Sequence, residues 1–119
     1  MLMIRDVQMH AFRDKFLQEF ETRRLADIAR RFPTRYRKLG EGRTRAIIQK
    51  AVKVCDRLGA HGELDVANFI DLMIWFGESF AWNPKLAFET QPLRNPVLPG
   101  DARVQLTMAR LGVEPGFHE

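Results

Sequence analysis

The chain has 119 residues, of which 45% are hydrophobic and 29% are charged, and its formal net charge is +4. This length accommodates one ordinary domain, and the apolar content, which includes nine Phe and two Trp, excludes a chain that is disordered throughout. No run of 18 apolar residues occurs, and no cationic start is followed by an apolar stretch, so we expect neither a membrane-spanning helix nor a secretory signal peptide.

The first predicted element is a long helix from Asp6 to Phe32. Phe12, Phe16 and Phe20 recur at four-residue intervals, as on one face of an amphipathic helix. Residues 1–4 form an apolar lead-in suited to packing on the core as an extended arm. Proline lacks a backbone donor and disfavours helix at the residue before it, so the proline that follows Phe32 predicts the end of this helix.

A short turn capped by Thr34 is predicted next, and Gly40 then allows a sharp change of direction. A second long helix is predicted over residues 43–58, because its apolar residues have i, i+3, i+4, i+7 spacing. Gly59 is the expected left-handed terminator. The helix contains the only cysteine, Cys55, which indicates a buried thiol in a reducing compartment.

The third predicted helix begins near Glu63, is apolar on most sides, and ends at Gly77, which makes it the central helix of the fold. Asp71 lies inside its apolar run. Two interpretations stay open: a buried Asp71 with a hydrogen-bonding or arginine partner, or an Asp71 on the one exposed stripe of the helix.

The C-terminal part is predicted to contain a short helix from Asn83 to Pro92, an irregular proline-rich connection, and a last helix capped by Asp101 that ends at Leu111. The sequence therefore predicts an all-α fold, a compact bundle of about four to five helices. We expect residues 1–112 to form a single helical domain and residues 113–119 to form a loose C-terminal tail.

Three histidines, His10, His61 and His118, are scattered without metal-ligand spacing. Catalysis requires a nucleophile or metal that is held by convergent groups, and the sequence is poor in such groups. We therefore expect no enzyme activity, no metal and no cofactor.

Charge is distributed unevenly along the chain. Residues 30–57 carry ten basic and two acidic side chains, whereas residues 58–89 carry five acidic and one basic. The basic stretch fits an acidic protein surface, a nucleic acid, or a solvated face that is partly paired with carboxylates. Only Tyr36 interrupts it as a stacking aromatic, which favours a protein partner over a nucleic acid.

Aromatic residues near the end of the third helix, from Trp75 to Trp82, either close the core or serve as interface anchors. Together with the basic stretch they define the candidate partner-binding residues. These are Arg35, Arg37, Lys38, Arg43, Arg45, Lys53, Arg57, Trp75, Trp82 and Phe88.

Packing and turn residues over positions 4–90 resemble those of small helical bacterial proteins encoded beside type VI secretion spike, PAAR and toxic-effector genes. The segments that carry the resemblance are Ile4-Arg5, Gln8-Met9, Phe20 to Arg24, Arg30 to Pro33, Leu39-Gly40, Arg45 to Ile48, Leu58-Gly59, Asp65-Val66, Phe69 to Met73, Gly77, Phe80 and Asn83 to Leu86. The sequence departs from this group at Trp82-Asn83, where an acidic pair is expected.

The resemblance implies a cytoplasmic accessory protein of a type VI effector cluster, an adaptor or chaperone that binds an effector. An immunity protein that neutralises a cognate toxin fits the same setting, and a nucleic-acid-binding helical domain is the remaining alternative. We expect a protein partner and no membrane association, and a homo-oligomer stays open.

Overall fold

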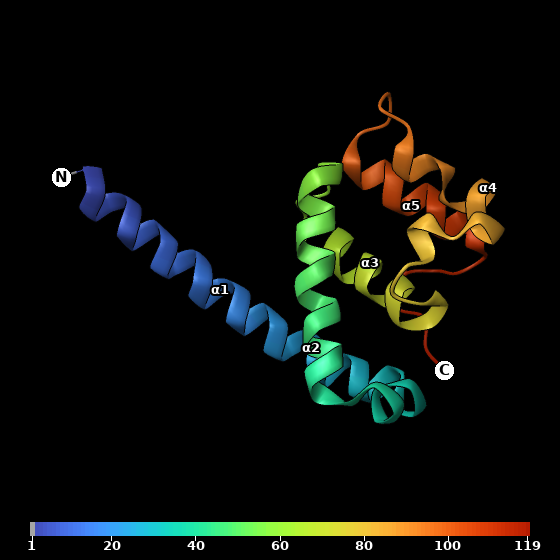
Figure 1. Ribbon diagram of the computed structural model, residues 1–119, viewed down its shortest axis with the longest axis horizontal. Helices are drawn as coiled ribbons and strands as arrows, with labels where there is room; N and C mark the ends of the chain where they lie inside the picture. The colour runs from blue at the N-terminus through green and yellow to red at the C-terminus, as the bar shows by residue number, and fades with distance from the viewer. Residues whose placement is uncertain (1) are drawn as a thin grey trace.

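Five α-helices and three short 3-10 helices follow one another along the chain, and no strand occurs within residues 2–119 (Figure 1). The computed structural model describes the backbone of residues 2–119 and the side chains of residues 14–119. The predicted all-α class is therefore confirmed. The helices are α1 (Leu2–Arg31), α2 (Pro33–Leu58), α3 (Glu63–Phe76), η1 (Phe80–Trp82), η2 (Pro84–Leu86), α4 (Ala87–Thr90), η3 (Gln91–Arg94) and α5 (Gly100–Leu111).

Helix α1 starts earlier than the sequence indicates. It is helical from Leu2 onward, so the prediction of an extended arm is wrong for residues 2–4. Its C-terminal end packs on α2, whereas its N-terminal half extends away from the other helices (Figure 1). The helix ends at Arg31, because Phe32, which precedes the proline, has the non-helical backbone angles φ −126° and ψ 58°.

Helix α2 bends sharply near its start. Gly40 has φ 79° and ψ 164°, a conformation that residues with a Cβ rarely adopt, and it separates a short helical segment, residues 33–39, from the long segment that follows. Gly59 ends the helix with φ 76°, as the sequence predicts.

Helix α3 is the centre of the fold. Its residues from Val66 to Ile74 are all buried, and the helix packs against α2 and α5. Asp71 is among these buried residues, at 3% exposure, so the interpretation with an exposed stripe is wrong for this side chain.

Helix α5 begins two residues earlier than predicted, because its N-cap is Pro99 and not Asp101. Gly100 is its first residue, and Asp101 lies in its first turn without making a side-chain cap, which corrects the predicted role of Asp101. A Cβ on Gly100 would lie 2.2 Å from the backbone of Gly59, so this glycine allows α5 to approach the turn between α2 and α3 closely.

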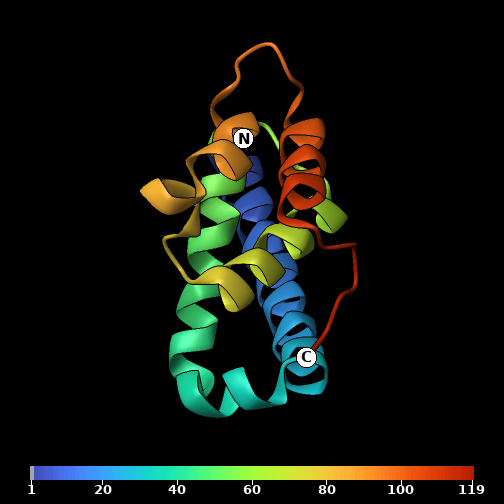
Figure 2. The ribbon, with the colours of Figure 1, turned by 90° about the vertical axis from the view of Figure 1, so that its right-hand side faces the viewer.

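After α5 the chain runs back along the molecule to the junction of α1 and α2 (Figure 2). The end of the tail is bonded there, since Glu119 accepts hydrogen bonds from Thr34 and Arg35, which corrects the prediction of a loose tail for this end, whereas residues 114–116 are exposed. Val113 and Phe117 are partly buried against the core. None of the described helices is both long enough and apolar enough to cross a lipid bilayer.

Candidate functional site

A buried guanidinium joins α1 to α3. The Arg31 side chain is only 10% exposed, and its Nη2 donates a hydrogen bond to Asp71 Oδ1 at 2.8 Å. Its Nε donates to Asp27 Oδ2 at 2.9 Å, and Nη2 is paired with the same carboxylate. Because Asp27 and Arg31 are four residues apart on α1, their side chains lie on one face of the helix. Arg31 is thereby fixed from two sides.

The two carboxylates have opposite pKa shifts. Burial raises the pKa of Asp71, and the hydrogen bond and charge of Arg31 only partly offset this effect. Burial also acts to raise the pKa of Asp27, but the contacts from Arg31, Arg30 and Arg24 outweigh it, and the pKa lies below its ordinary value. Asp27 is therefore the firmly ionised partner of this cluster.

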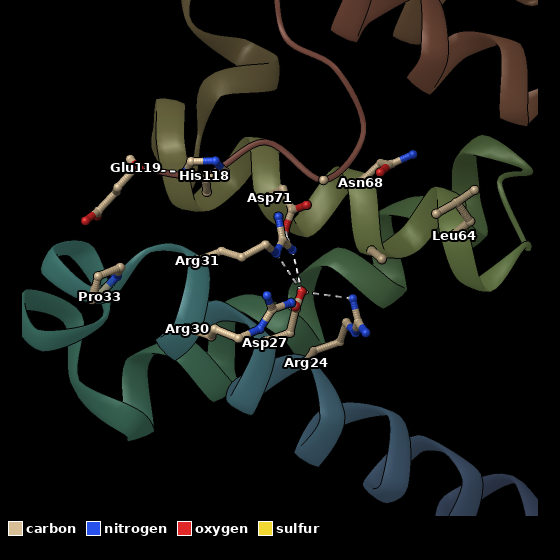
Figure 3. Close-up of a pocket in the computed structure, with 12 residues that line it drawn as sticks. Arg24, Asp27, Arg30, Arg31, Pro33, Leu64, Asn68, Asp71, His118 and Glu119 are labelled. Carbon is tan, nitrogen blue, oxygen red and sulfur yellow. Dashed lines mark hydrogen bonds and ion pairs between the residues drawn. The ribbon is translucent and has the colours of Figure 1, made fainter.

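A pocket of about 510 Å³ opens beside this cluster, between α1, α3 and the tail (Figure 3). Arg24, Asp27 and Arg31 line it from α1, Asn68 and Asp71 from α3, and Gly116, His118 and Glu119 from the tail. The charged groups on its α1 wall are engaged with one another, since Asp27 accepts hydrogen bonds from Arg24, Arg30 and Arg31. The pocket thus holds a paired charge cluster. No group of three or more potential metal ligands occurs in the part of the chain whose side chains are described.

The tail closes one side of the pocket. Arg31 Nη1 donates to the backbone oxygen of Phe117 at 2.7 Å, and the Phe117 ring packs edge-on against Phe32 with centroids 5.4 Å apart. The Glu119 carboxylate accepts hydrogen bonds from the backbone of Thr34 and Arg35 at the start of α2. The tail is therefore held by aromatic, backbone and charged contacts together.

Three of the predicted cationic residues are paired with carboxylates. Arg35 lies 3.3 Å from Glu119, and Arg43 lies 3.1 Å from Glu78. Arg45 pairs with Glu21 at 2.8 Å and also with Glu41. The predicted face is thus divided, and its exposed cations without an ion pair among residues 14–119 are Arg37, Lys38, Lys53 and Arg57.

A second set of cations lies later in the chain, outside the basic stretch of residues 30–57. Arg94 donates to the backbone oxygens of Ala81 and Ala87, and Arg110 donates to that of Phe88. Backbone carbonyls orient these guanidiniums without cancelling their charge. Within the described side chains no carboxylate pairs with Lys85, Arg94, Arg103 or Arg110.

The predicted aromatic residues separate into two groups. Trp75 is partly buried and packs against Phe32 and Phe117, so it belongs to the core and the tail contact. Trp82 and Phe88 are 59% and 68% exposed. Both exposed rings have a cation nearby: Lys50 Nζ lies 6.0 Å from the Trp82 centroid, and the Arg110 guanidinium carbon lies 4.4 Å from the Phe88 centroid.

Neither Cys55 on α2 nor His61 in the turn after it lines the pocket beside Arg31. His61 is exposed beside Asp56, at 3.5 Å, and the side chain of His10 lies outside the described residues. Cys55 is fully buried, as predicted, and burial together with the charge of Asp65 raises the pKa of its thiol to about 12. The thiol is therefore in its unreactive protonated form at neutral pH.

Sequence reasoning missed the Arg31 cluster and the docking of the tail. The signal for the first was an aspartate four residues before an arginine, Asp27 and Arg31, combined with the unexplained Asp71. The signal for the second was an aromatic residue and an acid, Phe117 and Glu119, in the segment that follows the last predicted helix. No family model, no curated protein and no solved structure matches the chain.

Proposed function

We propose that this chain is a non-catalytic helical protein that binds another protein, and that it serves a type VI secretion effector cluster as an adaptor or chaperone of an effector. The observation that carries the binding role is the exposure of Trp82 and Phe88, each beside a cation. Large aromatic rings with exposed faces are the residues that most often anchor protein interfaces.

The contact surface that we propose is built around α4, and we call it the aromatic–cationic surface. This surface is not the α2 face that the sequence favours. On the α2 face, Arg43 already pairs with Glu78, and Arg45 pairs with Glu21 and Glu41. The aromatic members of the aromatic–cationic surface supply apolar area, and its cations favour an acidic partner and accelerate encounter with it. The surface comprises Trp82, Lys85, Phe88 and Arg110.

The choice of partner rests on the resemblance of residues 4–90 to small proteins encoded beside type VI spike and effector genes. That resemblance consists of packing and turn residues, so it supports a shared scaffold, and the partner class is what membership of such a gene cluster would imply. An effector with an acidic surface is the partner that fits both the resemblance and the charge of the aromatic–cationic surface.

A pull-down with the products of adjacent genes tests the proposal. We expect the tagged wild-type chain to retain one of them, and the Trp82→Ala/Phe88→Ala variant to retain at least tenfold less, since loss of an anchor residue typically costs about 2 kcal/mol. Val97→Ala is the matched control, because Val97 is an 86% exposed hydrophobic residue outside the surface. Failure to retain any product, or equal retention by the wild type and the double variant, would overturn the proposal.

Co-expression separates the adaptor from the immunity protein. If the retained partner is a toxin, rescue of growth by the wild type and loss of rescue by Trp82→Ala/Phe88→Ala would replace the adaptor role with toxin neutralisation. A gel shift of nucleic acid that weakens steeply with added salt would instead favour the nucleic-acid alternative.

A further inference from the structure

The last residues of the tail occupy a slot between helices. The Phe117 ring packs against Phe32 and, at 6.0 Å and nearly perpendicular, against Trp75. On the same Trp75 ring lies the Arg35 guanidinium, with its carbon 3.6 Å from the centroid. The slot therefore offers an aromatic wall that is fixed by a cation.

The backbone of the tail is bound as well as its side chains. Arg31 Nη1 donates to the Phe117 oxygen at 2.7 Å, and the Arg31 oxygen accepts from the Glu119 nitrogen at 2.9 Å. These two bonds bracket His118, which is exposed and whose ring contacts only its neighbour's backbone oxygen among the hydrogen bonds of the described residues. The middle position of the bound segment is therefore not recognised by its side chain.

The Glu119 carboxylate is recognised at the start of α2. Its Oε2 accepts from the Thr34 nitrogen at 3.0 Å, and its Oε1 accepts from the Arg35 nitrogen at 2.9 Å. The first backbone donors of a helix lack partners within the helix and lie at the positive end of its dipole, so a carboxylate suits them. Desolvation acts to raise the pKa of Glu119, but these bonds outweigh it and lower the pKa to about 2.

The groups that bind the tail are positioned by other parts of the protein. Arg31 is held by Asp27 and Asp71, and the donors at the start of α2 are fixed by the helix itself. Trp75 lies near the C-terminal end of α3 and also packs on Phe32. The slot is therefore built on α1, α2 and α3. The segment that fills it contributes the aromatic ring of Phe117, then His118, whose side chain the slot does not bind, and then the carboxylate of Glu119.

We propose that this slot is a peptide-recognition site that binds an extended segment of a partner protein, with an aromatic residue followed two positions later by a carboxylate, and that the chain's own tail competes for it. We call it the tail slot, and it consists of Arg31, Phe32, Thr34, Arg35 and Trp75. The proposal builds on the protein-binding role above and adds a second, separate contact with defined ligand chemistry.

The tail is a ligand of the slot that remains tethered to α5. Residues 114–116, which connect the partly buried Val113 to Phe117, are exposed. A tethered ligand of this kind acts at an effective concentration of the order of millimolar, so a free segment competes poorly until the tail is weakened or displaced. The affinity of the tail for the slot therefore determines how tightly a segment of another protein must bind in order to displace it.

The test uses the full chain with Phe117→Ala and Glu119→Gln, which empties the slot while retaining its walls. Trp82→Phe is added so that Trp75 is the remaining tryptophan of the two and reports on the slot by fluorescence. The probe is a synthetic peptide with the sequence of residues 113–119 and an amidated C-terminus. We expect it to bind the emptied slot at least tenfold more tightly than it binds the chain with its tail intact.

Variant peptides test the recognition rule. We expect the peptide counterparts of Phe117→Ala and Glu119→Gln each to lose at least tenfold in affinity, and that of His118→Ala to change less than about twofold. A chain with Glu119→Gln alone, which keeps the aromatic contacts, should give an intermediate affinity and the same helical circular dichroism as the wild type.

Several outcomes would overturn the proposal: no saturable signal from Trp75, equal affinity for the emptied and intact chains, or indifference to the peptide's phenylalanine. The proposal would also be overturned if the wild-type chain formed a dimer and Phe117→Ala abolished it. The tail of a second copy of the chain would then be the occupant of the slot. Phe88→Ala should leave peptide binding unchanged, so failure at the tail slot is distinguishable from failure of the aromatic–cationic surface.

Discussion

Two neighbouring arginines show how burial decides the value of an ion pair. Arg31 and Arg30 both contact Asp27, but the side chain of Arg31 is 10% exposed and that of Arg30 is 73% exposed. The exposed pair is screened by water and contributes little to stability. The buried guanidinium also compensates the charge of Asp71, whose side chain is 4% exposed.

We therefore expect Arg31→Met to lower the free energy of unfolding by about 3 kcal/mol, because it leaves a buried carboxylate without its counter-charge. Arg30→Met is the matched control and should cost less than about 1 kcal/mol. Urea unfolding followed by circular dichroism measures both. If adding Asp71→Leu to Arg31→Met restores no stability, the uncompensated carboxylate is not the cause.

The sequence could pose the question of Asp71 but could not answer it. An acid within an apolar run predicts either a partner or an exposed stripe, and the partner, Arg31, is 40 residues away in the chain. Which arginine reaches it depends on how α1 crosses α3, and periodicity does not determine that crossing. The charged pairs of Arg45 with Glu21 and Arg43 with Glu78 were unpredictable for the same reason.

Helix boundaries, in contrast, were largely readable, because prolines and glycines act locally. Pro33, Gly59, Gly77 and Gly112 all end or divide helices where the sequence predicts. The exceptions are segments whose order comes from packing. The tail follows a helix-ending glycine and looks unstructured by composition, yet Phe117 and Glu119 find sites on distant helices.

Gly40 and Gly42 are glycines for different reasons. Gly40 has backbone angles that require glycine, whereas Gly42 lies in regular helix, where glycine only lowers helix propensity. Gly40 has φ 79° and ψ 164°, whereas Gly42 lies in the helical part of α2, and an added Cβ would meet nothing within 4 Å at either position. Gly40→Ala should therefore destabilise the fold by about 2 kcal/mol through backbone strain. Gly42→Ala should stabilise it by about 0.5 kcal/mol. Urea midpoints measure both, and shifts of the same sign would contradict this assignment.

The overall shape is elongated because only the C-terminal part of α1 packs on the other helices (Figure 1). The radius of gyration is 15.2 Å, whereas about 13.5 Å is typical of a compact chain of this length. The excess comes from the N-terminal half of α1, which extends away from the body (Figure 1). The phenylalanine stripe of the sequence predicts one apolar face on this helix. Phe20 is buried as expected, but Phe16 is 53% exposed, although it borders a pocket that Val52 of α2 and Val66 of α3 also line.

Hydrogen exchange of backbone amides should record this difference along a single helix. A helical segment without tertiary contacts is marginally stable, so we expect residues 14–19, which are nearly all exposed, to exchange at least a hundredfold faster than residues 24–31 of the same helix. Mass-spectrometric exchange of the full chain at low micromolar concentration measures both segments, with residues 66–74 of α3 as the slowly exchanging reference. Equal protection of the two α1 segments at this concentration would contradict the expectation. Protection of residues 14–19 that grows with protein concentration would assign the exposed face of Phe16 to a second copy of the chain.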